Sequence, residues 1–191
     1  MYDVIVVGAG PAGASAAIFT AKAGLKTLMI DSGQGVTRRA FMKNHYGAPD
    51  ISGPTLVETG KQQAAELGAE LLDGKVTILH KTNSGIELTF ENGSRYEGSQ
   101  VILCTGMWTD VAEQAGIQTQ AGTEPRVKSI IVVDSQGRTT LPGVWAAGTA
   151  AGVSMHTIVT AGDGARVAIN LISEVKGSRW VDHDVLPTEQ H

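Results

Sequence analysis

The stretch that decides the fold is Tyr2–Asp31, YDVIVVGAGPAGASAAIFTAKAGLKTLMID. It opens with a short β-branched apolar run, Val4–Val7, which suits a buried strand of a parallel sheet. Three glycines follow in the spacing GxGxxG: Gly8, Gly10 and Gly13. In this pattern the first glycine allows a tight turn, the second lets a pyrophosphate approach the backbone, and the third lets helix and strand pack closely.

An alanine-rich helix is predicted after the glycines, over Ala12–Ala23. Pro11 suits its first turn, and Gly24 suits its C-terminal cap. The free N–H groups at the helix start are expected to face phosphates. A second strand, Leu28–Ile30, ends at Asp31, roughly 20 residues beyond the glycines, where an acid accepts hydrogen bonds from an adenosine ribose and repels a 2′-phosphate. The stretch predicts a bound dinucleotide and leaves open whether it is NAD or FAD.

Length and composition indicate one globular domain. The 191 residues are 42% hydrophobic and 18% charged, with a net charge of −4 that offers no basic surface for nucleic acid. No apolar run approaches membrane-spanning length and no charged leader precedes the first strand, so we expect no membrane insertion, no signal peptide and a cytoplasmic location. We expect a single domain over residues 1–177 and a polar tail over residues 178–191.

Cys104 is the only cysteine, so no disulfide and no cysteine metal cluster can form within one chain. Its place inside the apolar run at 101–104 favours a small core side chain over a reactive thiol. In the loop after Asp31, Arg38 and Arg39 could meet phosphates or a charged partner, and the pattern favours a solvated surface for both.

The remaining pattern completes an α/β fold. A helix is predicted from about Ser52, with Pro54 in its first turn, to Gly68. Asn92-Gly93 between alternating apolar residues signals a hairpin. Further strands are predicted at 71–72, 76–79, 86–90, 94–96, 101–104, 130–133 and 144–147, and a last helix at about 155–175. We therefore predict a Rossmann-like FAD/NAD(P)-binding fold: a parallel sheet with helices and a small inserted antiparallel β-meander.

A late motif distinguishes NAD from FAD. TTLPGVWAAG at 139–148, followed by a helix, resembles the second flavin-contacting motif of the two-dinucleotide-binding flavoproteins. Within that pyridine nucleotide-disulfide oxidoreductase superfamily, the chain most resembles the FAD-binding domain of low-molecular-weight thioredoxin reductases. The other matching segments are VIVVGAGPAGASAA at 4–17, SGQ at 32–34, KNHYG at 43–47, ISGPTLVE at 51–58, VILCTG at 101–106 and TAGDGARVA at 160–168. The resemblance implies FAD as the cofactor.

The resemblance also implies a role for individual residues. Gln34 and Asn44 match positions beside the flavin, Thr105 and Gly106 match a motif near the cofactor, and Gly148 matches the late glycine, where a small residue lets the ribityl chain lie against the backbone. The full set of predicted cofactor-binding residues is Gly8, Gly10, Pro11, Ala12, Gly13, Asp31, Gln34, Asn44, Thr105, Gly106, Gly148, Thr149 and His156. No catalytic side chain and no metal ligand is predicted.

Two substitutions depart from the family pattern. Thr149 stands where the family has an aspartate that holds the ribityl chain; its hydroxyl can hydrogen-bond but carries no charge, so a lower flavin affinity is expected. Met155-His156 replaces an Arg-Gln pair before the last helix, and His156 is either a donor to the flavin edge or only a helix-start residue. The N–H groups of that helix start are expected to face the pyrimidine edge and favour flavin reduction.

The larger departure is Met107–Val127, which is too short for the second Rossmann unit that binds NADPH and carries the CxxC of the family. The leading prediction is therefore an FAD-binding oxidoreductase supplied by external NAD(P)H or a protein electron donor, without its own dithiol. The alternatives are a non-catalytic FAD-binding or interaction module, and an NAD-binding protein that uses only the first motif. A homodimer is expected because an isolated FAD domain exposes surface.

Overall fold

The structure is a computed structural model that describes residues 1–182 and 184–185. A mixed seven-stranded sheet has the order β5-β2-β1-β8-β7-β6, with β11 also paired to β8. Its strands are β1 (Tyr2–Val7), β2 (Thr27–Asp31), β5 (Glu70–Asp73), β6 (Val76–Lys81), β7 (Ile86–Phe90), β8 (Arg95–Leu103) and β11 (Val144–Ala146). The parallel pairs join β5, β2, β1, β8 and β11, whereas β6 and β7 form the antiparallel meander. The predicted fold class is confirmed.

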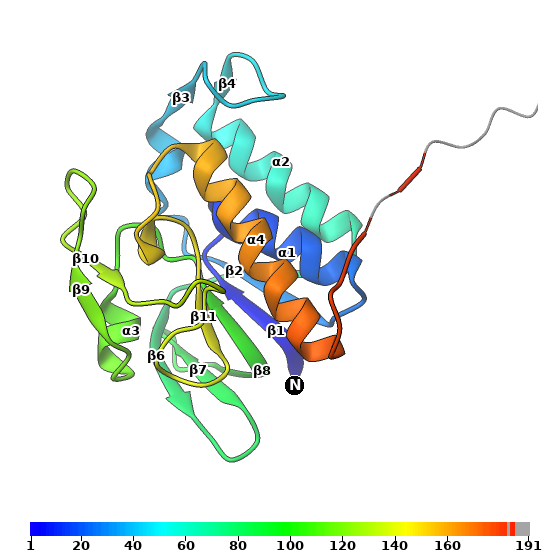
Figure 1. The fold of residues 1–191 in the computed structure, drawn as a ribbon. Coiled ribbons are helices and arrows are strands. Elements are labelled where there is room, and N and C mark those ends of the chain that lie inside the picture. The colour runs from blue at the N-terminus through cyan, green and yellow to red at the C-terminus, as the bar shows by residue number, and fades with distance from the viewer. Residues whose placement is uncertain (183, 186–191) are drawn as a thin grey trace, which may run out of the picture.

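Three helices lie side by side on one face of the sheet (Figure 1). They are α1 (Pro11–Lys22), α2 (Gly53–Glu66) and α4 (Thr157–Lys176). Ser52 caps α2 by accepting a hydrogen bond from the Thr55 N–H at 3.2 Å, which stabilises the helix start beside Pro54. Among the described helices, none combines the length and the apolar character that crossing a membrane requires.

Smaller elements connect these layers. Two short antiparallel pairs are formed by β3 (Phe41–Met42) with β4 (Ile51–Ser52) and by β9 (Thr119–Ala121) with β10 (Ser129–Ile131). The remaining elements are α3 (Asp110–Gln114) and the 3₁₀ turns η1 (Val36–Arg39) and η2 (Gly148–Ala151). The strand predicted at 130–133 corresponds to β10, whereas β9 was not predicted, because it is only three residues long and largely polar.

Strand β8 corrects the prediction of two separate strands at 94–96 and 101–104. It runs unbroken for nine residues, pairing antiparallel with β7 over 95–98 and parallel with β1 from Gly98 onward. The polar residues between the two predicted strands lie where β8 changes partners. One of them, Gln100, accepts a hydrogen bond from the Trp145 indole at 2.9 Å. The long strand thus joins the meander to the parallel sheet.

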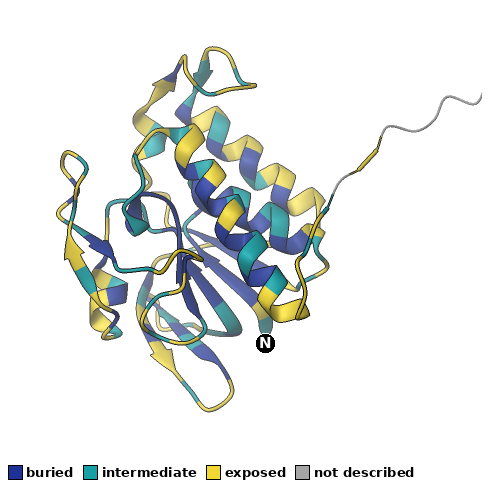
Figure 2. Ribbon diagram, in the orientation of Figure 1, coloured by how far each residue is buried: buried dark blue, intermediate teal, exposed yellow. Residues whose placement is uncertain are grey.

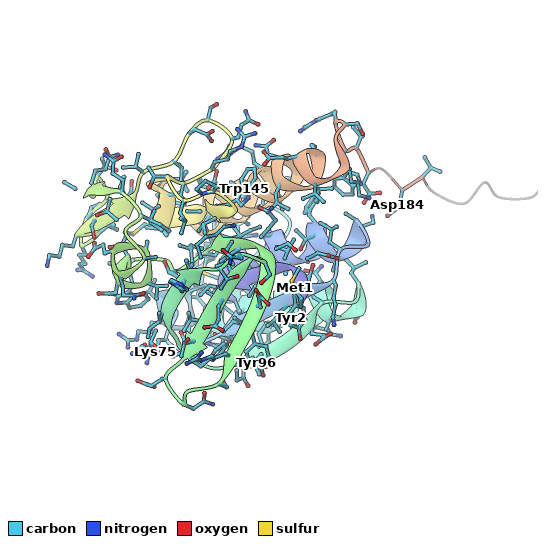
Figure 3. The ribbon with its side chains drawn as sticks, turned by 90° about the horizontal axis from the view of Figure 1, so that it is seen from below. Met1, Tyr2, Lys75, Tyr96, Trp145 and Asp184 are labelled. Carbon is cyan, nitrogen blue, oxygen red and sulfur yellow. The ribbon has the colours of Figure 1, made fainter. Side chains whose placement is uncertain are left out.

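Two buried apolar clusters lie on opposite faces of the sheet. One lies between the sheet and the three helices and includes Met29, Trp145 and Leu171; the other lies beneath the meander and α3 and includes Ile5 and Leu88. The ribbon coloured by burial shows the central strands mostly in the colour of buried residues (Figure 2). Seen from below, Trp145 lies on the α4 side of the sheet and Tyr96 on the meander side (Figure 3). The central strands β1, β2 and β11 are therefore covered on both faces, whereas the edge strands β5 and β6 carry exposed residues.

The C-terminal segment beyond α4 is partly docked. Trp180 packs edge-on against Phe19 of α1, with ring centroids 6.1 Å apart. Lys22 pairs with Asp182 at 3.0 Å and also contacts Asp184. The first half of the predicted tail is therefore held on α1, while residues 183 and 186–191 lie outside the described residues.

Helix α1 packs closely against both α2 and α4 through small residues. A Cβ placed on Gly60 of α2 would lie 2.7 Å from the Ala14 Cβ, and one placed on Gly164 of α4 would lie 2.0 Å from the Ala12 carbonyl oxygen. Both distances are too short for real atoms. The glycines therefore set the spacing of the helix layer, and with it the position of the α1 N-terminus.

We predict opposite effects for two glycine-to-alanine changes on α4. Gly164→Ala should lower the free energy of unfolding by about 1–3 kcal/mol, because the added methyl overlaps backbone atoms of α1. Gly162→Ala should raise it by about 0.5–1 kcal/mol, since a Cβ there meets no atom within 4 Å and alanine favours helix. Urea denaturation of both variants measures this difference. Equal effects of the two substitutions would contradict the close packing of α1 on α4.

Candidate functional site

A cavity of about 670 Å³, here called the main cavity, follows the carboxyl ends of the parallel strands. Its wall includes the residues at or just beyond four strand ends: Asp31 after β2, Gly8 after β1, Thr105 after β8 and Ala147 after β11. Open α/β sheets bind ligands along this edge. The volume lies within the roughly 300–1,000 Å³ typical of small-molecule sites.

The glycine turn occupies the centre of the main cavity. Gly8 has a φ of +111°, and a Cβ on it would lie 2.3 Å from the Cys104 carbonyl oxygen. A Cβ on Gly13 would lie 1.7 Å from the Gly8 carbonyl oxygen, so α1 begins in direct contact with the turn. Gly10, in contrast, has nothing within 4 Å of a Cβ position and lines the main cavity. Its missing side chain leaves open space in front of the helix start.

The first turn of α1 presents unpaired backbone donors to that space. Gly10 occupies the N-cap position of α1 and Pro11 follows it, and no side chain caps the helix. The first N–H groups of a helix have no partner within it, and the helix dipole places partial positive charge there. This arrangement suits an anionic group such as a pyrophosphate.

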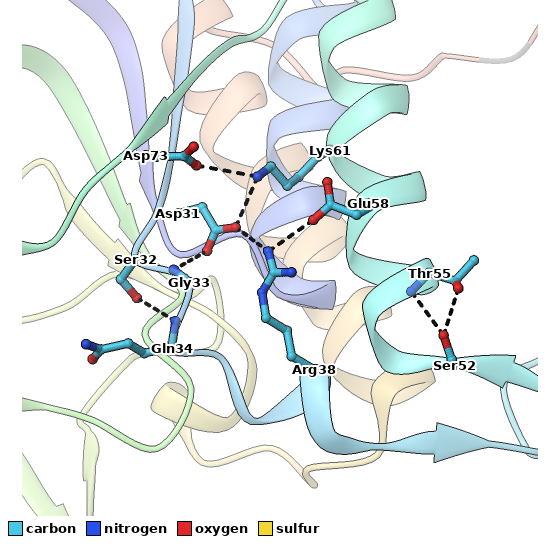
Figure 4. Close-up of polar contacts among 10 residues, drawn as sticks. All are labelled: Asp31, Ser32, Gly33, Gln34, Arg38, Ser52, Thr55, Glu58, Lys61 and Asp73. Carbon is cyan, nitrogen blue, oxygen red and sulfur yellow. Dashed lines mark hydrogen bonds and ion pairs between the residues drawn. The ribbon is translucent and has the colours of Figure 1, made fainter.

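Asp31 lies at one end of the main cavity, in an ion-pair cluster (Figure 4). Its Oδ2 accepts hydrogen bonds from Arg38 Nη2 at 2.7 Å and Lys61 Nζ at 3.2 Å, and its Oδ1 accepts the Gly33 N–H at 2.8 Å. Arg38 also contacts Glu58 at 3.1 Å. Arg38 is half-buried, so the prediction of a purely solvated side chain is wrong for this residue.

The cluster lowers the pKa of Asp31. Burial by itself acts in the opposite direction and raises the pKa, but the hydrogen bonds from Gly33, Arg38 and Lys61 outweigh it. Asp31 is therefore ionised at neutral pH. Its Oδ1 has one described partner, and a carboxylate oxygen can accept a second hydrogen bond.

The opposite end of the main cavity is formed by η2 and the start of α4. Gly148 has a φ of +76°, and its N–H donates to Oδ2 of the buried Asp163 at 2.8 Å. Arg166 pairs with the other oxygen of Asp163 at 2.8 Å. Thr149 is 8% exposed and lines the main cavity. Asp163 thus fixes the turn that carries Thr149.

The structure brings most of the predicted cofactor-binding residues to the wall of the main cavity. Those that line it are Gly8, Gly10, Pro11, Ala12, Asp31, Gln34, Thr105, Gly106 and Thr149. Gly13 and Gly148 lie behind the wall, where they allow close packing against Gly8 and Ala12. Asn44 and His156 are exposed and do not line the main cavity; His156 is the N-cap residue of α4 and contacts Ser154 Oγ at 2.8 Å.

Several lining residues were not among the predicted cofactor-binding residues. They come from the β5–β6 connection and the start of β6, from the segment after β8 and from the start of α4: Gly74, Lys75, Val76, Thr77, Trp108, Asp110, Thr157 and Thr160. Of these, Trp108 carried a detectable signal, because a tryptophan in a loop two residues after a Thr-Gly pair is unusual.

Cys104 lies buried beneath the glycine turn. Burial raises the pKa of its thiol, with a smaller contribution from the negative charge of Asp163. The thiol therefore stays protonated at neutral pH, which agrees with its interpretation as a core side chain.

The Asp31 cluster predicts a pH-dependent contribution to stability. Because the folded pKa of Asp31 lies below its ordinary value of 3.8, the ionised carboxylate stabilises the fold above about pH 4, and this contribution disappears as the pH falls through the folded pKa. Asp31→Asn should cost about 1–3 kcal/mol at pH 7 and less at pH 3. Urea denaturation at both pH values measures the difference. Asp73→Asn is the matched control, since Asp73 contacts Lys61 at 3.5 Å but its side chain is 88% exposed. A cost for Asp31→Asn that is equal at pH 7 and pH 3 would contradict the assignment.

The chain is similar in sequence to several curated thioredoxin reductases. Thioredoxin reductase of Aquifex aeolicus is 38% identical over 112 residues, which cover 56% of this chain and 34% of the relative. Thioredoxin reductase of Treponema pallidum is 41% identical over 110 residues, covering 55% of this chain and 35% of the relative. The chain therefore aligns with about a third of the length of these curated relatives.

Solved structures share the fold over nearly the whole chain. The atypical thioredoxin reductase TRi from Desulfovibrio vulgaris Hildenborough matches with a TM-score of 0.81 and 21% identity, covering 93% of this chain and 99% of that one. A thioredoxin reductase from Gloeobacter violaceus matches with a TM-score of 0.81 and 17% identity, covering 97% and 99%. The pyridine nucleotide-disulphide oxidoreductase family model matches residues 2–122 and 71–165. The chain belongs to the pyridine nucleotide-disulphide oxidoreductase family.

Proposed function

We propose that the main cavity binds FAD and that the chain is an FAD-dependent oxidoreductase that receives electrons from an external donor. The observation that carries the proposal is the extent of the main cavity, which runs from Asp31 past the glycine turn to Thr149. A dinucleotide needs such a site: a ribose acceptor at one end, a phosphate position in the middle and room for a second ring system at the other end.

The residues present fit FAD in its predicted orientation. Asp31 Oδ1 would accept a hydrogen bond from the adenosine ribose, and the N–H groups at the start of α1 would hold the pyrophosphate in the space that Gly10 leaves open. Thr149 would hydrogen-bond the ribityl chain through its hydroxyl. Bound FAD supplies the redox chemistry.

The electron donor and acceptor are proposed to be external. The sequence holds one cysteine, and the Cys104 thiol is buried and protonated, so these 191 residues cannot exchange electrons with a disulfide through a dithiol of their own. The segment 107–127, where the family carries its NADPH-binding unit, forms only α3, β9 and short loops. Free NADH or NADPH, or a protein reductase, would then supply the electrons.

The second candidate is a non-catalytic FAD-binding module. It is favoured by Thr149, whose hydroxyl stands where the family pattern has a carboxylate. The third candidate is an NAD-binding protein that uses only the glycine turn. The main cavity argues against it, because the lining extends past the glycine turn to Thr149, Thr157 and Thr160.

An absorption spectrum of the purified chain, before and after addition of FAD, tests the proposal. We expect flavin bands that stay with the protein on gel filtration. Anaerobic addition of NADH and then NADPH should bleach them with at least one nucleotide, or a protein reductase should do so. Bands that no donor bleaches would establish the non-catalytic alternative, and no bands after FAD addition would contradict the cofactor assignment.

We predict that Gly10→Val weakens FAD binding while leaving the stability of the fold nearly unchanged. Gly10 has an extended backbone, with φ of −70° and ψ of −176°, that valine adopts freely, so the variant should melt within a few degrees of the wild type. The valine methyls would fill the space in front of the α1 start and should weaken FAD binding by more than about tenfold, a loss of about 1.4 kcal/mol. Absorbance titration with FAD and a thermal melt followed by circular dichroism measure both effects, with Gly162→Ala as the control for an exposed glycine outside the main cavity.

We further propose that the chain forms a homodimer in the cytoplasm. Large apolar side chains are exposed on the β3–β4 hairpin and the start of α4, including Phe41, Tyr46 and Val159. A hydrogen bond of 2.9 Å between His45 and Thr157 joins these two segments into one surface. Apolar surface of this kind is typical of an interface. Light scattering of the eluting protein gives the mass, and a monomer would contradict the dimer.

A further inference from the structure

His45 lies in the β3–β4 hairpin and is half-buried. The hairpin lies beside the N-terminal end of α4 (Figure 1). There, Nδ1 of His45 lies 2.9 Å from Oγ1 of Thr157, the first residue of α4. His45 does not line the main cavity, whereas Thr157 does. The imidazole is therefore separated from the main cavity by one hydroxyl group.

Thr157 lies at the end of the main cavity that is opposite Asp31. Its carbonyl accepts a hydrogen bond from the hydroxyl of Thr160, one turn further along α4, at 3.0 Å. Thr160 in turn packs on η2, since a Cβ on Gly148 would lie 3.7 Å from the Thr160 Cβ. Both threonines line the main cavity. Thr157 is thus held next to the turn that carries Thr149, where the second ring system of a dinucleotide would lie.

The lining of the main cavity offers no side chain of the type that exchanges a proton near neutral pH. Among the described lining residues, those that ionise are Asp31, Lys75, Cys104 and Asp110. In ordinary surroundings a carboxyl group releases its proton well below neutral pH, and a lysine or a buried thiol releases it well above. Imidazole gains and loses a proton near neutral pH. Of the described histidines, His45 is the one whose ring contacts a lining side chain.

The charged and titratable groups on the elements that pack around this hydrogen bond are Lys43, Tyr46 and Asp50 on the hairpin, Glu58 on α2, Glu124 on the β9–β10 turn and His156 before α4. In the described part of the chain, the His45 ring hydrogen-bonds Thr157 and pairs with none of them. His156 contacts the Ser154 hydroxyl, which does not line the main cavity, so this second histidine offers no parallel route.

We propose that His45 and Thr157 relay a proton from solvent to the ring end of the main cavity. The inference rests on the proposed FAD function. Two-electron reduction of a flavin consumes at least one proton. A hydride donor brings hydrogen along with its electrons, whereas a protein donor delivers electrons alone. With a protein reductase as the donor, the proton therefore reaches the main cavity by a path of its own.

The relay moves one proton in and one proton out. Protonated His45 passes the proton on Nδ1 to Thr157 Oγ1, while the Thr157 hydroxyl releases its own proton into the main cavity. The imidazole is left neutral, and solvent at its half-buried ring restores the proton. Because His45 acts through Thr157, it is a positioning residue for the transferred proton rather than a catalytic residue.

Stopped-flow reduction of the FAD-loaded chain by dithionite tests the relay, because dithionite delivers electrons without hydrogen. The rate is followed between about pH 5 and pH 8, in the oligomeric state that light scattering finds. His45→Asn keeps a hydrogen-bonding atom near the Nδ1 position but holds no proton. It should slow reduction at pH 7 by about tenfold or more and remove the pH dependence near neutral pH. His80→Asn, an exposed histidine on β6, is the matched control and should keep the wild-type profile.

Further variants separate proton transfer from a structural role. Thr157→Val should behave like His45→Asn, whereas Thr157→Ser keeps the hydroxyl and should keep most of the rate. Imidazole added to His45→Ala should restore reduction with the pH dependence of free imidazole. Absorbance titration should show that His45→Asn binds FAD within about threefold of the wild type, since His45 does not line the main cavity. In the FAD-free protein, Thr157→Val should shift the ¹⁵N resonance of His45 Nδ1, because it removes the hydrogen-bond partner.

The outcomes separate this inference from the FAD assignment. Bound FAD that is reduced equally fast in the wild type and in His45→Asn at every pH would overturn the relay and leave the FAD assignment intact. The same holds if Asp110→Asn or His156→Asn removes the pH dependence while His45→Asn keeps it. An unchanged Nδ1 resonance in Thr157→Val would show that the hydrogen bond is not made, and would also overturn the relay. A chain that binds no FAD would overturn both the proposed function and the relay.

Discussion

The structure depends on the contact between the first turn of α1 and the glycine turn after β1. A Cβ on Gly13 would lie 1.7 Å from the Gly8 carbonyl oxygen, so even one methyl group would push the helix away from the sheet. That contact holds the α1 N-terminus at the edge of the parallel strands, where its unpaired N–H groups can meet an anion. It also holds Ala12 against Gly148 and Gly164. The same close contacts therefore determine both the packing of the helix layer and the position of the main cavity's wall.

Local chemistry explains why much of the fold could be predicted. The strand–glycine–helix–strand unit, the Ser52 cap and the Asn92-Gly93 hairpin each depend on residues a few positions apart, and the structure has all three. The continuity of β8 could not be predicted in this way. Its middle residues are polar, and they remain in a strand because β1 and β7 supply partners from distant parts of the chain. Strand pairing that changes partner midway leaves no periodic signal in the sequence.

In the site, too, features that depend on neighbouring residues were predictable, and features that depend on distant parts of the chain were not. The glycines and Asp31 were predictable because a parallel strand delivers its last residue to a known edge. The Arg38–Asp31–Lys61 cluster was not, since it joins η1, β2 and α2, and their relative positions are fixed only by packing. Its consequence is electrostatic: the hydrogen bonds from Arg38 and Lys61 lower the pKa of Asp31 and keep its carboxylate charged.

The distribution of ionisable groups around the main cavity indicates what the chain itself contributes. Among the described lining residues, those that ionise are Asp31, Lys75, Cys104 and Asp110. Asp31 ends β2, Lys75 lies in the β5–β6 connection, Asp110 is the first residue of α3, and Cys104 is buried. The opposite end offers hydroxyls from Thr149, Thr157 and Thr160. Hydroxyl groups orient a ligand by hydrogen bonds without titrating near neutral pH. Under the proposed function, this end would therefore position the bound ring through hydrogen bonds and would leave its redox chemistry to the ring itself.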